Sequence, residues 1–416
     1  MQDKNTAQST FLQLFRPILC DSIQNRFASL EIDKYAKKLK TVQLILLMVC
    51  AQLEQLKGLR AISGSLKDDR LSHTLQLESI SHAQLSRRLR DLPSEVVQML
   101  FRKLVSDFAK DYGYDKIRKT LGRFYLIDAT TVSLCLSRYP WASYVNSKSG
   151  IKLHLRLVFH DGMTIPDKAV VTPAIQTDKT KMQELIVEEK DALNVFDRGY
   201  LDYKLFDRYC AEGIRFVTRL KSNAVVKVIA ERLVDPNGRI KSDQHVILGA
   251  NSLHRMQHPL RLVETEDTDG NPIRILTNDF ELSTAEISDI YRYRWQIELF
   301  FKWIKQHLRV KHYYGLSQQA VENQLFIALI TYCLMLLLQI KTGFQGTLLT
   351  IKRQLTTCLY DSFESFVRKL YQKFGSSSKG RRRRIDHEAR FQEILRQVVV
   401  QEADHLDDLT YDPVVL

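Results

Sequence analysis

The spacing of hydrophobic and polar positions divides the chain into an N-terminal helical part and a longer part in which strands and helices alternate. Residues 1–115 are mostly helix-forming, and the long apolar stretch 41–59 contains no proline and no glycine before Gly58. Such spacing is typical of helices that pack against one another. From about residue 121 strand-like runs alternate with helix-like runs, which predicts an α/β core.

The strand-like runs place two acidic residues at distinctive positions. Asp128 lies in the middle of the β-rich run 124–134, and Asp197 ends a short apolar strand just before a glycine turn. An ionised carboxylate inside an apolar strand is costly unless a neighbouring backbone group, an arginine or a metal ion satisfies it. Asp197 is equally compatible with a turn-capping role. The other elements expected in this part are strands at 151–159, 169–172 and 214–220 and helices at 183–192 and 203–212. Asp178 is the expected cap of the first of these helices.

The second half of the chain changes character twice. Residues 222–285 hold short β-like runs separated by Asp-Pro-Asn-Gly and Asp-Thr-Asp-Gly-Asn-Pro turns, which predicts a β-rich insertion in the core. Residues 286–374 are again helical. Their uncharged run 323–340 is just long enough to cross a membrane, but its polar residues favour a buried helix. Residues 375–416 comprise a flexible linker, a basic run and an acidic tail; the four arginines of the run fit either a solvated segment or a phosphate-binding patch.

The composition of the chain indicates what kind of partner it binds. The 416-residue chain has ordinary hydrophobic and charged content, 44% and 26%, but a formal net charge of +13. Residues 385–416 carry −6, which leaves +19 on residues 1–384. Such an excess suits a polyanion, with nucleic acid as the first candidate and an acidic membrane surface as the second.

Cysteine and histidine spacing gives no sign of a zinc site or a disulfide framework. The six cysteines never form a Cys-x2-Cys pair, and most are expected to be buried thiols in a reducing compartment. His254 and His258 are four residues apart but lie in a polar, loop-like region, so no metal site is expected there. The N-terminus lacks a basic-then-apolar signal sequence. We therefore expect a cytoplasmic protein.

One N-terminal segment has the features of a DNA-reading helix. Ser81 is a suitable N-cap, Ala83, Leu85 and Leu89 form an apolar side, and several polar residues should be exposed. These are Gln84, Arg87, Arg88 and Arg90. The segment fits either a helix-turn-helix recognition helix or a basic amphipathic helix packed on its neighbours, and the net charge slightly favours DNA contact.

Residues 283–308 carry the most informative pattern. Ser283, followed three residues later by Glu286, predicts a capping box at the start of a helix. At about 100° per residue, four functional side chains fall on one narrow stripe of that helix: Tyr291, Arg294, Glu298 and Lys305. A neighbouring arc is apolar and should face the core: Ile290, Ile297, Phe300, Phe301, Ile304 and Leu308. Taken alone, the charged stripe is best interpreted as a solvated face with i,i+4 ion pairs.

The amino-acid sequence around this stripe resembles that of a known family. Tyr-x2-Arg-x3-Glu-x6-Lys, set in YRYRWQIELFFKWIKQHL, is similar to the YREK signature of bacterial insertion-sequence DDE transposases of the insertion-sequence-four family. LIDATTV around Asp128 and FDRGY around Asp197 resemble the first two acidic motifs of that family. VTRLKSNA at 217–224 and LTNDF at 276–280 also fit, so that the resemblance covers most of residues 40–340.

The resemblance implies a fold and a set of roles. The core, 116–221 and 286–374, would be RNase H-like, and residues 1–115 would bind the terminal inverted repeats. Asp128, Asp197 and Glu298 would be catalytic and would hold Mg²⁺, with Mn²⁺ as an alternative. The DNA-contact residues would be Tyr291, Arg294, Trp295, Lys305, Arg219, Lys221, Arg87 and Arg88.

The expected activity is cut-and-paste DNA transposition, in which end cleavage is followed by strand transfer into target DNA. The resemblance also implies a homodimer when two ends are paired, a nucleoid-associated protein and no membrane partner. Two alternatives stay open: an RNase H-like nuclease that does not integrate, and an inactive DNA-binding protein derived from a transposase.

Overall fold

The computed structural model describes residues 9–112, 123–145, 148–160, 163–235, 238–249, 255–266 and 270–372, together with residues 392 and 396. Contacts divide the chain into two units, Met1–Val367 and Arg368–Leu416. The architecture below is that of the first unit. The expected linker, the four arginines at 381–384 and most of the acidic tail lie outside the described residues.

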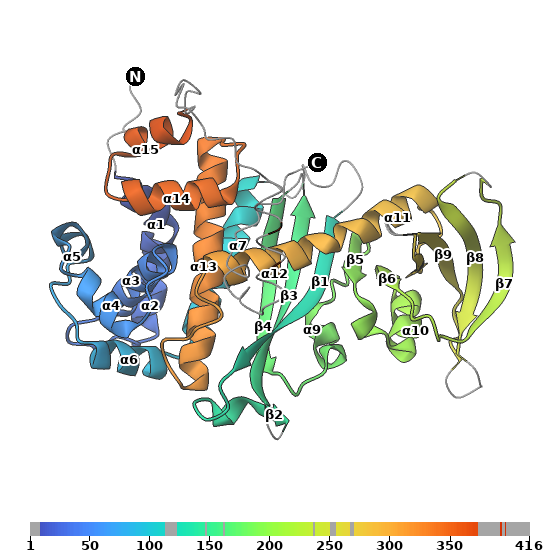
Figure 1. Cartoon of the computed structure of the whole chain (residues 1–416), viewed down its shortest axis with the longest axis horizontal. Helices are drawn as coiled ribbons and strands as arrows, with labels where there is room; N and C mark the ends of the chain where they lie inside the picture. The colour runs from blue at the N-terminus through green and yellow to red at the C-terminus, as the bar shows by residue number, and fades with distance from the viewer. Residues whose placement is uncertain are drawn as a thin grey trace. The chain divides into compact units, whose positions relative to one another are not determined.

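A ten-stranded sheet forms the centre of the first unit (Figure 1). Its order is β2-β3-β1-β5-β6-β10-β9-β8-β7, with β4 also paired to β3. β1, β3 and β4 are antiparallel, whereas β1, β5 and β6 are parallel. This mixed sheet confirms the predicted α/β class and is consistent with an RNase H-like core. The strands of this part are β1 (Arg123–Leu134), β2 (Ser143–Val145), β3 (Lys148–His160), β4 (Met163–Pro173), β5 (Ala192–Phe196) and β6 (Arg215–Arg219).

The strands predicted for the insertion are present, but they extend the central sheet rather than form a separate one. β10 pairs with β6, which brings Ile275 opposite Arg219. β9, β8 and β7 follow outward, with β7 at the edge. Apolar side chains of these strands share one buried cluster with α10 (Tyr203–Glu212), which includes Phe206 and Tyr209. The strands are β7 (Val226–Arg232), β8 (Ile240–Leu248), β9 (Leu260–Glu266) and β10 (Pro272–Thr277).

The N-terminal part is helical, as predicted. Its helices are α1 (Thr10–Leu19), α2 (Asp21–Ser29), α3 (Thr41–Leu53), α4 (Leu59–Ser65), α5 (Asp69–Leu75), α6 (His82–Asp91) and α7 (Ser94–Tyr112). The apolar stretch expected to run to residue 59 stops at Leu53, because Gln55 adopts a left-handed backbone with φ 52°. α3 is buried on nearly all sides, so it is a central helix of this bundle.

The basic helix α6 begins with the predicted cap, because Ser81 and Gln84 form a capping box. Leu85 and Leu89 are buried, but Ala83 is exposed and does not belong to the apolar side. Arg88 is not free at the surface as expected. Its guanidinium donates to Asp33 at 2.6 Å and to Thr41 Oγ1 at 2.9 Å, and it thereby ties α6 to α3.

The helix predicted at 183–192 is mostly absent. A 3₁₀ turn, η2 (Asp178–Lys181), leads into the short α9 (Met182–Leu185), and the chain is extended by Ile186. The side chain of Asn194 on β5 accepts from the Val187 backbone N–H and donates to its carbonyl, both at 2.9 Å. These two bonds satisfy the backbone N–H and carbonyl of Val187 without helical hydrogen bonds. Thr177, not Asp178, occupies the N-cap position.

The helix predicted from Ser283 is present as α11 (Thr284–Tyr293) and α12 (Trp295–His307), which meet at a single turn residue, Arg294. Ser283 and Glu286 form the predicted capping box. The apolar arc is buried as expected, with Ile297, Phe300 and Ile304 among its members. In Figure 1 the two helices run across the sheet in front of β1.

α13 (Gln318–Thr342) contains the uncharged run whose alternative was a membrane span. It is the one helix, among those described, that is long and apolar enough to cross a membrane, and 72% of its apolar window is buried inside the protein. It contacts α1, α3, α6, α7 and β4. Its burial confirms the prediction of a core helix. α14 (Leu348–Cys358) and α15 (Phe363–Leu370) follow.

Candidate active site

The sheet brings Asp128 and Asp197 next to each other. β1 and β5 are parallel neighbours, and Ile127 is paired with Phe196. Asp128 follows Ile127 on β1, and Asp197 follows Phe196 at the end of β5. Asp197 still has an extended backbone, with φ −79° and ψ 162°. Side chains at matching positions of adjacent extended chains point to the same face. The two carboxylates predicted from separate motifs therefore share one face of the sheet.

α12 brings Glu298 to the same place. Its contact with β1 is bridged by Arg294, whose guanidinium lies 2.6 Å from Glu298 Oε1 and 3.6 Å from Asp128 Oδ2. The predicted pair Arg294–Glu298 is confirmed. Arg294 is largely buried, so this cation stands between two carboxylates instead of forming a surface ion pair.

The carboxyl group of Asp128 has an unusual acidity. Its pKa is raised from 3.8 to about 7, mainly by burial and to a lesser extent by the charges of Asp197 and Glu298, against the lowering effect of the Ala129 N–H and of Arg294. The Asp128 Oδ1 atom accepts from that N–H at 2.8 Å. A buried carboxyl surrounded by two others takes up a proton or a cation readily.

The donor chemistry of this cluster fits a hard divalent cation, which prefers carboxylate oxygens. In the described part of the chain, however, no three Asp, Glu, His or Cys side chains are close enough to share one ion. The Arg294 guanidinium lies between Asp128 and Glu298, 3.6 Å from the first and 2.6 Å from the second.

A pocket of about 500 Å³ opens beside the two carboxylates. Asp128 and Glu298 line it together with three lysines of α12 and the segment after it: Lys302, Lys305 and Lys311. The ammonium group of Lys305 donates to Thr130 Oγ1 at 2.5 Å and to the Thr131 carbonyl at 3.2 Å. A pocket lined by both acids and cations can hold a metal-bound phosphate group.

The other stripe residues have contrasting environments. Tyr291 is buried, its ring lies 5.7 Å from the Arg294 guanidinium carbon, and burial raises its pKa to about 12. Trp295 is 56% exposed, so it is not part of the apolar arc. Arg219, at the end of β6, is half-buried and its charge acts on Tyr291, whereas Lys221 is exposed. Arg87 is exposed on α6, on the N-terminal bundle.

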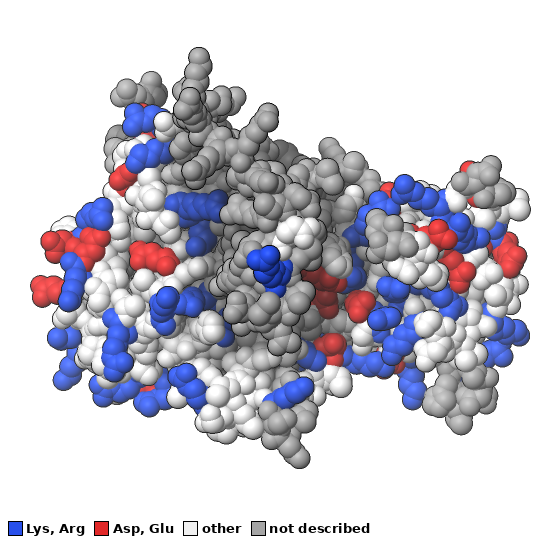
Figure 2. Space-filling view, viewed as in Figure 1, with Lys and Arg blue, Asp and Glu red and all other residues white. Residues whose placement is uncertain are grey.

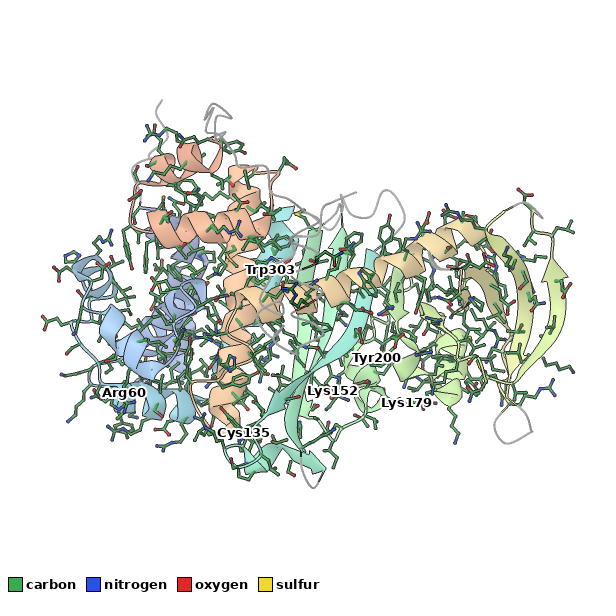
Figure 3. The ribbon with its side chains drawn as sticks, in the orientation of Figure 1. Arg60, Cys135, Lys152, Lys179, Tyr200 and Trp303 are labelled. Carbon is green, nitrogen blue, oxygen red and sulfur yellow. The ribbon has the colours of Figure 1, made fainter. Side chains whose placement is uncertain are left out.

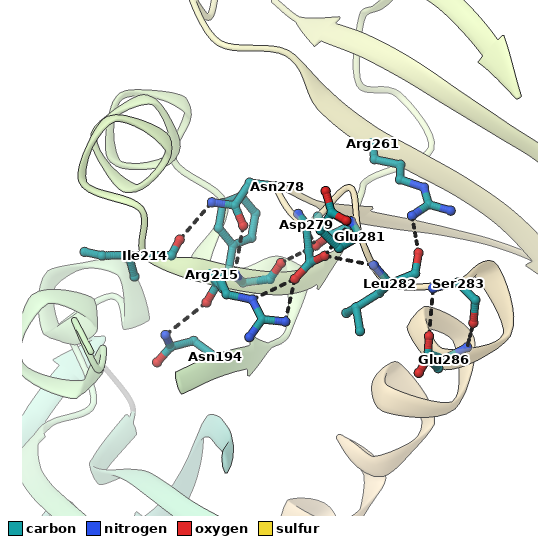
Figure 4. Close-up of polar contacts among 12 residues, drawn as sticks. Asn194, Ile214, Arg215, Arg261, Asn278, Asp279, Glu281, Leu282, Ser283 and Glu286 are labelled. Carbon is teal, nitrogen blue, oxygen red and sulfur yellow. Dashed lines mark hydrogen bonds and ion pairs between the residues drawn. The ribbon is translucent and has the colours of Figure 1, made fainter. Parts of the chain in front are cut away.

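A hydrogen-bond network fixes the start of α11 and hence the direction of the helix that carries Glu298 (Figure 4). Asn278 bridges the Ile214 carbonyl and the Phe216 N–H at 2.8 and 3.0 Å. The Asp279 carboxylate binds Arg215 at 2.6 Å and accepts from the backbone N–H of Glu281 and Leu282. Arg261 donates to the Leu282 carbonyl. The segment LTNDF therefore joins β10 and β6 to the helix, a role that its sequence alone does not reveal.

Two further residues of the site were not singled out from sequence. Tyr200, in the turn η3 (Arg198–Tyr200), is 1% exposed and its hydroxyl has no hydrogen-bond partner among the described residues. Burial raises its pKa, and the charges of Asp128, Asp178 and Asp197 raise it further. Asp178 pairs with Lys152 at 3.0 Å. The motif FDRGY already contained Tyr200, but only the fold shows that it is buried near these acidic residues.

Comparison with known proteins agrees with this geometry. The family described as Transposase DDE domain matches residues 119–334, and a domain of unknown function matches residues 6–75. The chain is 30% identical over 307 residues to the "Probable transposase for insertion sequence element IS5377" of Geobacillus stearothermophilus, which covers 71% of this chain and 74% of that protein. It is 33% identical over 248 residues to the "Putative transposase y4zB" of Sinorhizobium fredii, with coverage of 56% and 68%.

Among solved structures, the piggyBac transposase synaptic complex with hairpin DNA aligns with 91% of this chain and 84% of that chain, at a TM-score of 0.44 and 13% identity. That likeness is too low to support an argument. The family match spans more than half of the chain and contains all three candidate carboxylates. The chain therefore belongs to the DDE transposases, a family of DNA-cleaving and strand-transferring enzymes, and its relatives identify it as a transposase of a bacterial insertion sequence.

Proposed function

We propose that the chain is a cut-and-paste transposase of the insertion-sequence-four type, whose YREK residues are Tyr291, Arg294, Glu298 and Lys305. The observation that carries this proposal is the position of Arg294, which lies 2.6 Å from Glu298 on α12 and 3.6 Å from Asp128 on β1, while Asp197 follows the parallel neighbouring strand β5. A helix that needed only surface ion pairs would not place its glutamate beside a buried aspartate. The similarity of this segment to the YREK signature supports the same assignment.

Asp128, Asp197 and Glu298 are the residues that would hold Mg²⁺ or Mn²⁺. When bound, such ions activate the attacking hydroxyl and stabilise the leaving oxygen of a phosphodiester displacement. For its part, the chain supplies a fixed carboxylate pair on the sheet and a third carboxylate on α12. The buried apolar arc of α12 and the network at Asn278 and Asp279 hold that helix in place.

Arg294 changes partner in this proposal. Its guanidinium neutralises Asp128 and Glu298 in the metal-free protein. With metal ions held by the carboxylates, Arg294 would be available to bind a DNA phosphate, and Lys305 of α12 would bind another. Tyr291 supports Arg294 through its ring. Trp295, which is exposed, is free to stack on an unpaired base.

The remaining contacts are assigned by exposure and charge. Residues 1–115 would bind the terminal inverted repeats through Arg87 and its exposed neighbours. Arg88 is left out, because its guanidinium is bound to Asp33 and Thr41. Arg219 and Lys221 would contact phosphates near the cleaved bond. The protein would act as a homodimer that pairs two ends, in the cytoplasm with the nucleoid.

The test uses DNA that carries the element's own terminal repeats. Asp128→Asn and Glu298→Gln should each reduce Mg²⁺-dependent end cleavage and strand transfer by at least about 100-fold, since each removes a carboxylate donor from the site. Binding to the ends should stay nearly unchanged. Asp289→Asn is the matched control, because Asp289 lies on α11 in an exposed pair with Arg292. Full activity of either site variant would contradict the assignment.

A second readout separates transposition from simple cleavage. A transposase joins the freed 3′-hydroxyl end to target DNA, whereas a nuclease stops at the cut. We expect joined products from the wild-type chain in the same reaction. Cleavage without any joined product would identify an RNase H-like nuclease instead.

A further inference from the structure

A second pocket, separate from the one beside Glu298, lies at the end of β5 and β6. It has a volume of about 650 Å³ and is formed by the start of α10, the segment after β6 and the end of β8. Four cationic side chains line it: Lys179, Lys204, Lys221 and Arg255. All four are exposed, and they come from separate segments of the chain. We call this pocket the basic groove.

The two acidic residues of the basic groove form hydrogen bonds with other groups and no ion pair with these cations. Asp202 caps α10 by accepting from the backbone N–H of Lys204 and Leu205. Asp207 accepts from the backbone N–H of Gln257 and His258 and from the His258 ring. Within the described ranges, none of the four cationic side chains forms an ion pair. The four cations outnumber the two carboxylates, which leaves the groove with an excess of two positive charges.

The basic groove lies at the same edge of the sheet as the candidate active site. Asp197 ends β5, and only the turn η3 separates it from Leu201 and Asp202, which line the groove. The turns η2 and η3 are in contact, and Lys179 lies close to Tyr200 in Figure 3. The carboxyl ends of parallel strands are where α/β proteins bind their ligands.

The surface around α10 and the strands β7 to β10 carries charges of both signs. Figure 2 shows many Lys and Arg side chains there, with several acidic side chains among them and another acidic group near the centre of the view. A series of separated cations, rather than one compact cluster, matches the regular spacing of phosphates along a nucleic acid backbone.

We infer that Lys179, Lys204 and Arg255 of the basic groove bind the DNA backbone at phosphates beyond those assigned to Lys221, away from the cleaved bond, so that DNA bound at Asp128 and Asp197 continues along α10. This inference rests on the proposed function and names an additional binding surface for its substrate. Backbone contacts of this kind position DNA without reading its sequence. The basic groove should therefore bind the DNA that flanks the element, whatever the sequence of that DNA.

The experiment compares two triple variants of the full chain. Lys179→Gln, Lys204→Gln and Arg255→Gln remove three charges from the groove, while Lys190→Gln, Lys227→Gln and Lys241→Gln remove three exposed charges elsewhere. Binding is measured over a range of salt concentrations on duplexes that carry one terminal repeat, with and without flanking DNA. The slope of log K against log salt reports the number of phosphate contacts.

We expect the groove variant to lower that slope by up to about 2.7 on the flanked duplex, since each lost phosphate contact contributes about 0.9. On the duplex without a flank it should match the wild type, and so should the control variant on both duplexes. An unchanged slope on flanked DNA, or an equal loss in the control, would overturn the inference. If the triple variant does not fold, Lys179→Gln and Lys204→Gln are measured singly, with an expected decrease of about 0.9 each.

The outcome is separable from that of the proposed function. Metal-dependent cleavage of the unflanked duplex at low salt should be retained by the groove variant and lost in Asp128→Asn. If Asp128→Asn stays active while the slope changes as expected, the groove binds DNA and the assignment of the carboxylates is wrong. If cleavage fails only in Asp128→Asn and the slope does not change, the proposed function stands and the groove has no such role.

Discussion

At the scale of single residues, the sequence predicted which acidic residues belong to the candidate site but not which side chains surround them. The anomaly of Asp128, a carboxylate within an apolar strand, was visible in the strand pattern, and Asp197 was recognised at a strand end. The family resemblance contributed Glu298. Neither pattern nor resemblance indicated that Arg294 would stand between Asp128 and Glu298, because that contact depends on how α12 crosses β1.

The raised pKa of Asp128 predicts how the metal-free protein responds to pH. The folded chain keeps a proton on Asp128 up to about pH 7, whereas the unfolded chain releases it near pH 3.8. The stabilising contribution of that proton is thus fully present below about pH 4 and is lost as pH rises through 7. Asp128→Asn removes this dependence. Its free energy of unfolding, relative to wild type, should rise between pH 4 and 7 by at most about 1.4 kcal/mol per pH unit.

Urea unfolding in the presence of a chelator measures this difference at pH 5, 6, 7 and 8. The difference between variant and wild type should level off above pH 7. A difference that stays constant from pH 5 to 8 would show that Asp128 is already ionised at pH 5 in the metal-free protein.

Tyr200 allows a second prediction at this scale. Its hydroxyl is buried without a hydrogen-bond partner among the described residues, and such a group costs about 1–3 kcal/mol. Tyr200→Phe removes the hydroxyl and keeps the ring that packs against Phe196. The variant should therefore be more stable than wild type by about 1 kcal/mol in the same urea titration. A loss of stability would instead show that the hydroxyl donates to one of the nearby carboxylates.

At the scale of elements, periodicity and capping rules worked where an element is determined by its own residues. The capping box at Ser283 and the apolar arc of α12 are local properties, and both were predicted. The helix expected at 183–192 failed because the side chain of Asn194, on a neighbouring strand, binds the backbone at Val187. A contact between separate elements cannot be read from the periodicity of either one.

The junction between β10 and α11 gives a prediction about such a contact. Asp279 is buried and binds both Arg215 and two backbone N–H groups, so Asp279→Ala leaves several polar groups without a partner. We expect a loss of about 2–4 kcal/mol in the free energy of unfolding. Asp289→Ala, which breaks the exposed pair with Arg292, should cost less than about 1 kcal/mol. Similar losses in both variants would mean that the junction is not a stabilising tie.

At the scale of the whole molecule, sequence separated a helical N-terminal part from an α/β part but did not predict how closely they are joined. Residues 1–367 form one compact unit. Asn323, at the start of α13, donates to the carbonyls of Leu89 and Leu92 at 3.1 and 2.8 Å. Arg309 donates to Gln52 Oε1 and to backbone carbonyls next to it. The boundary expected near residue 115 lies outside the described residues, so these contacts come from elements well away from it.

These ties predict that the N-terminal helices and the sheet unfold together. The three tryptophans, Trp141, Trp295 and Trp303, all belong to the α/β part, so their fluorescence reports on that part alone, whereas far-ultraviolet circular dichroism also reports the helices of residues 9–112. Because α13 packs against both parts, the two signals should give one urea midpoint. Asn323→Ala, which removes the donor to Leu89 and Leu92, should lower both midpoints equally, at a cost of about 1–3 kcal/mol. If only the dichroism midpoint shifts, the helical part unfolds separately, and end binding and catalysis would then reside in two independently stable bodies.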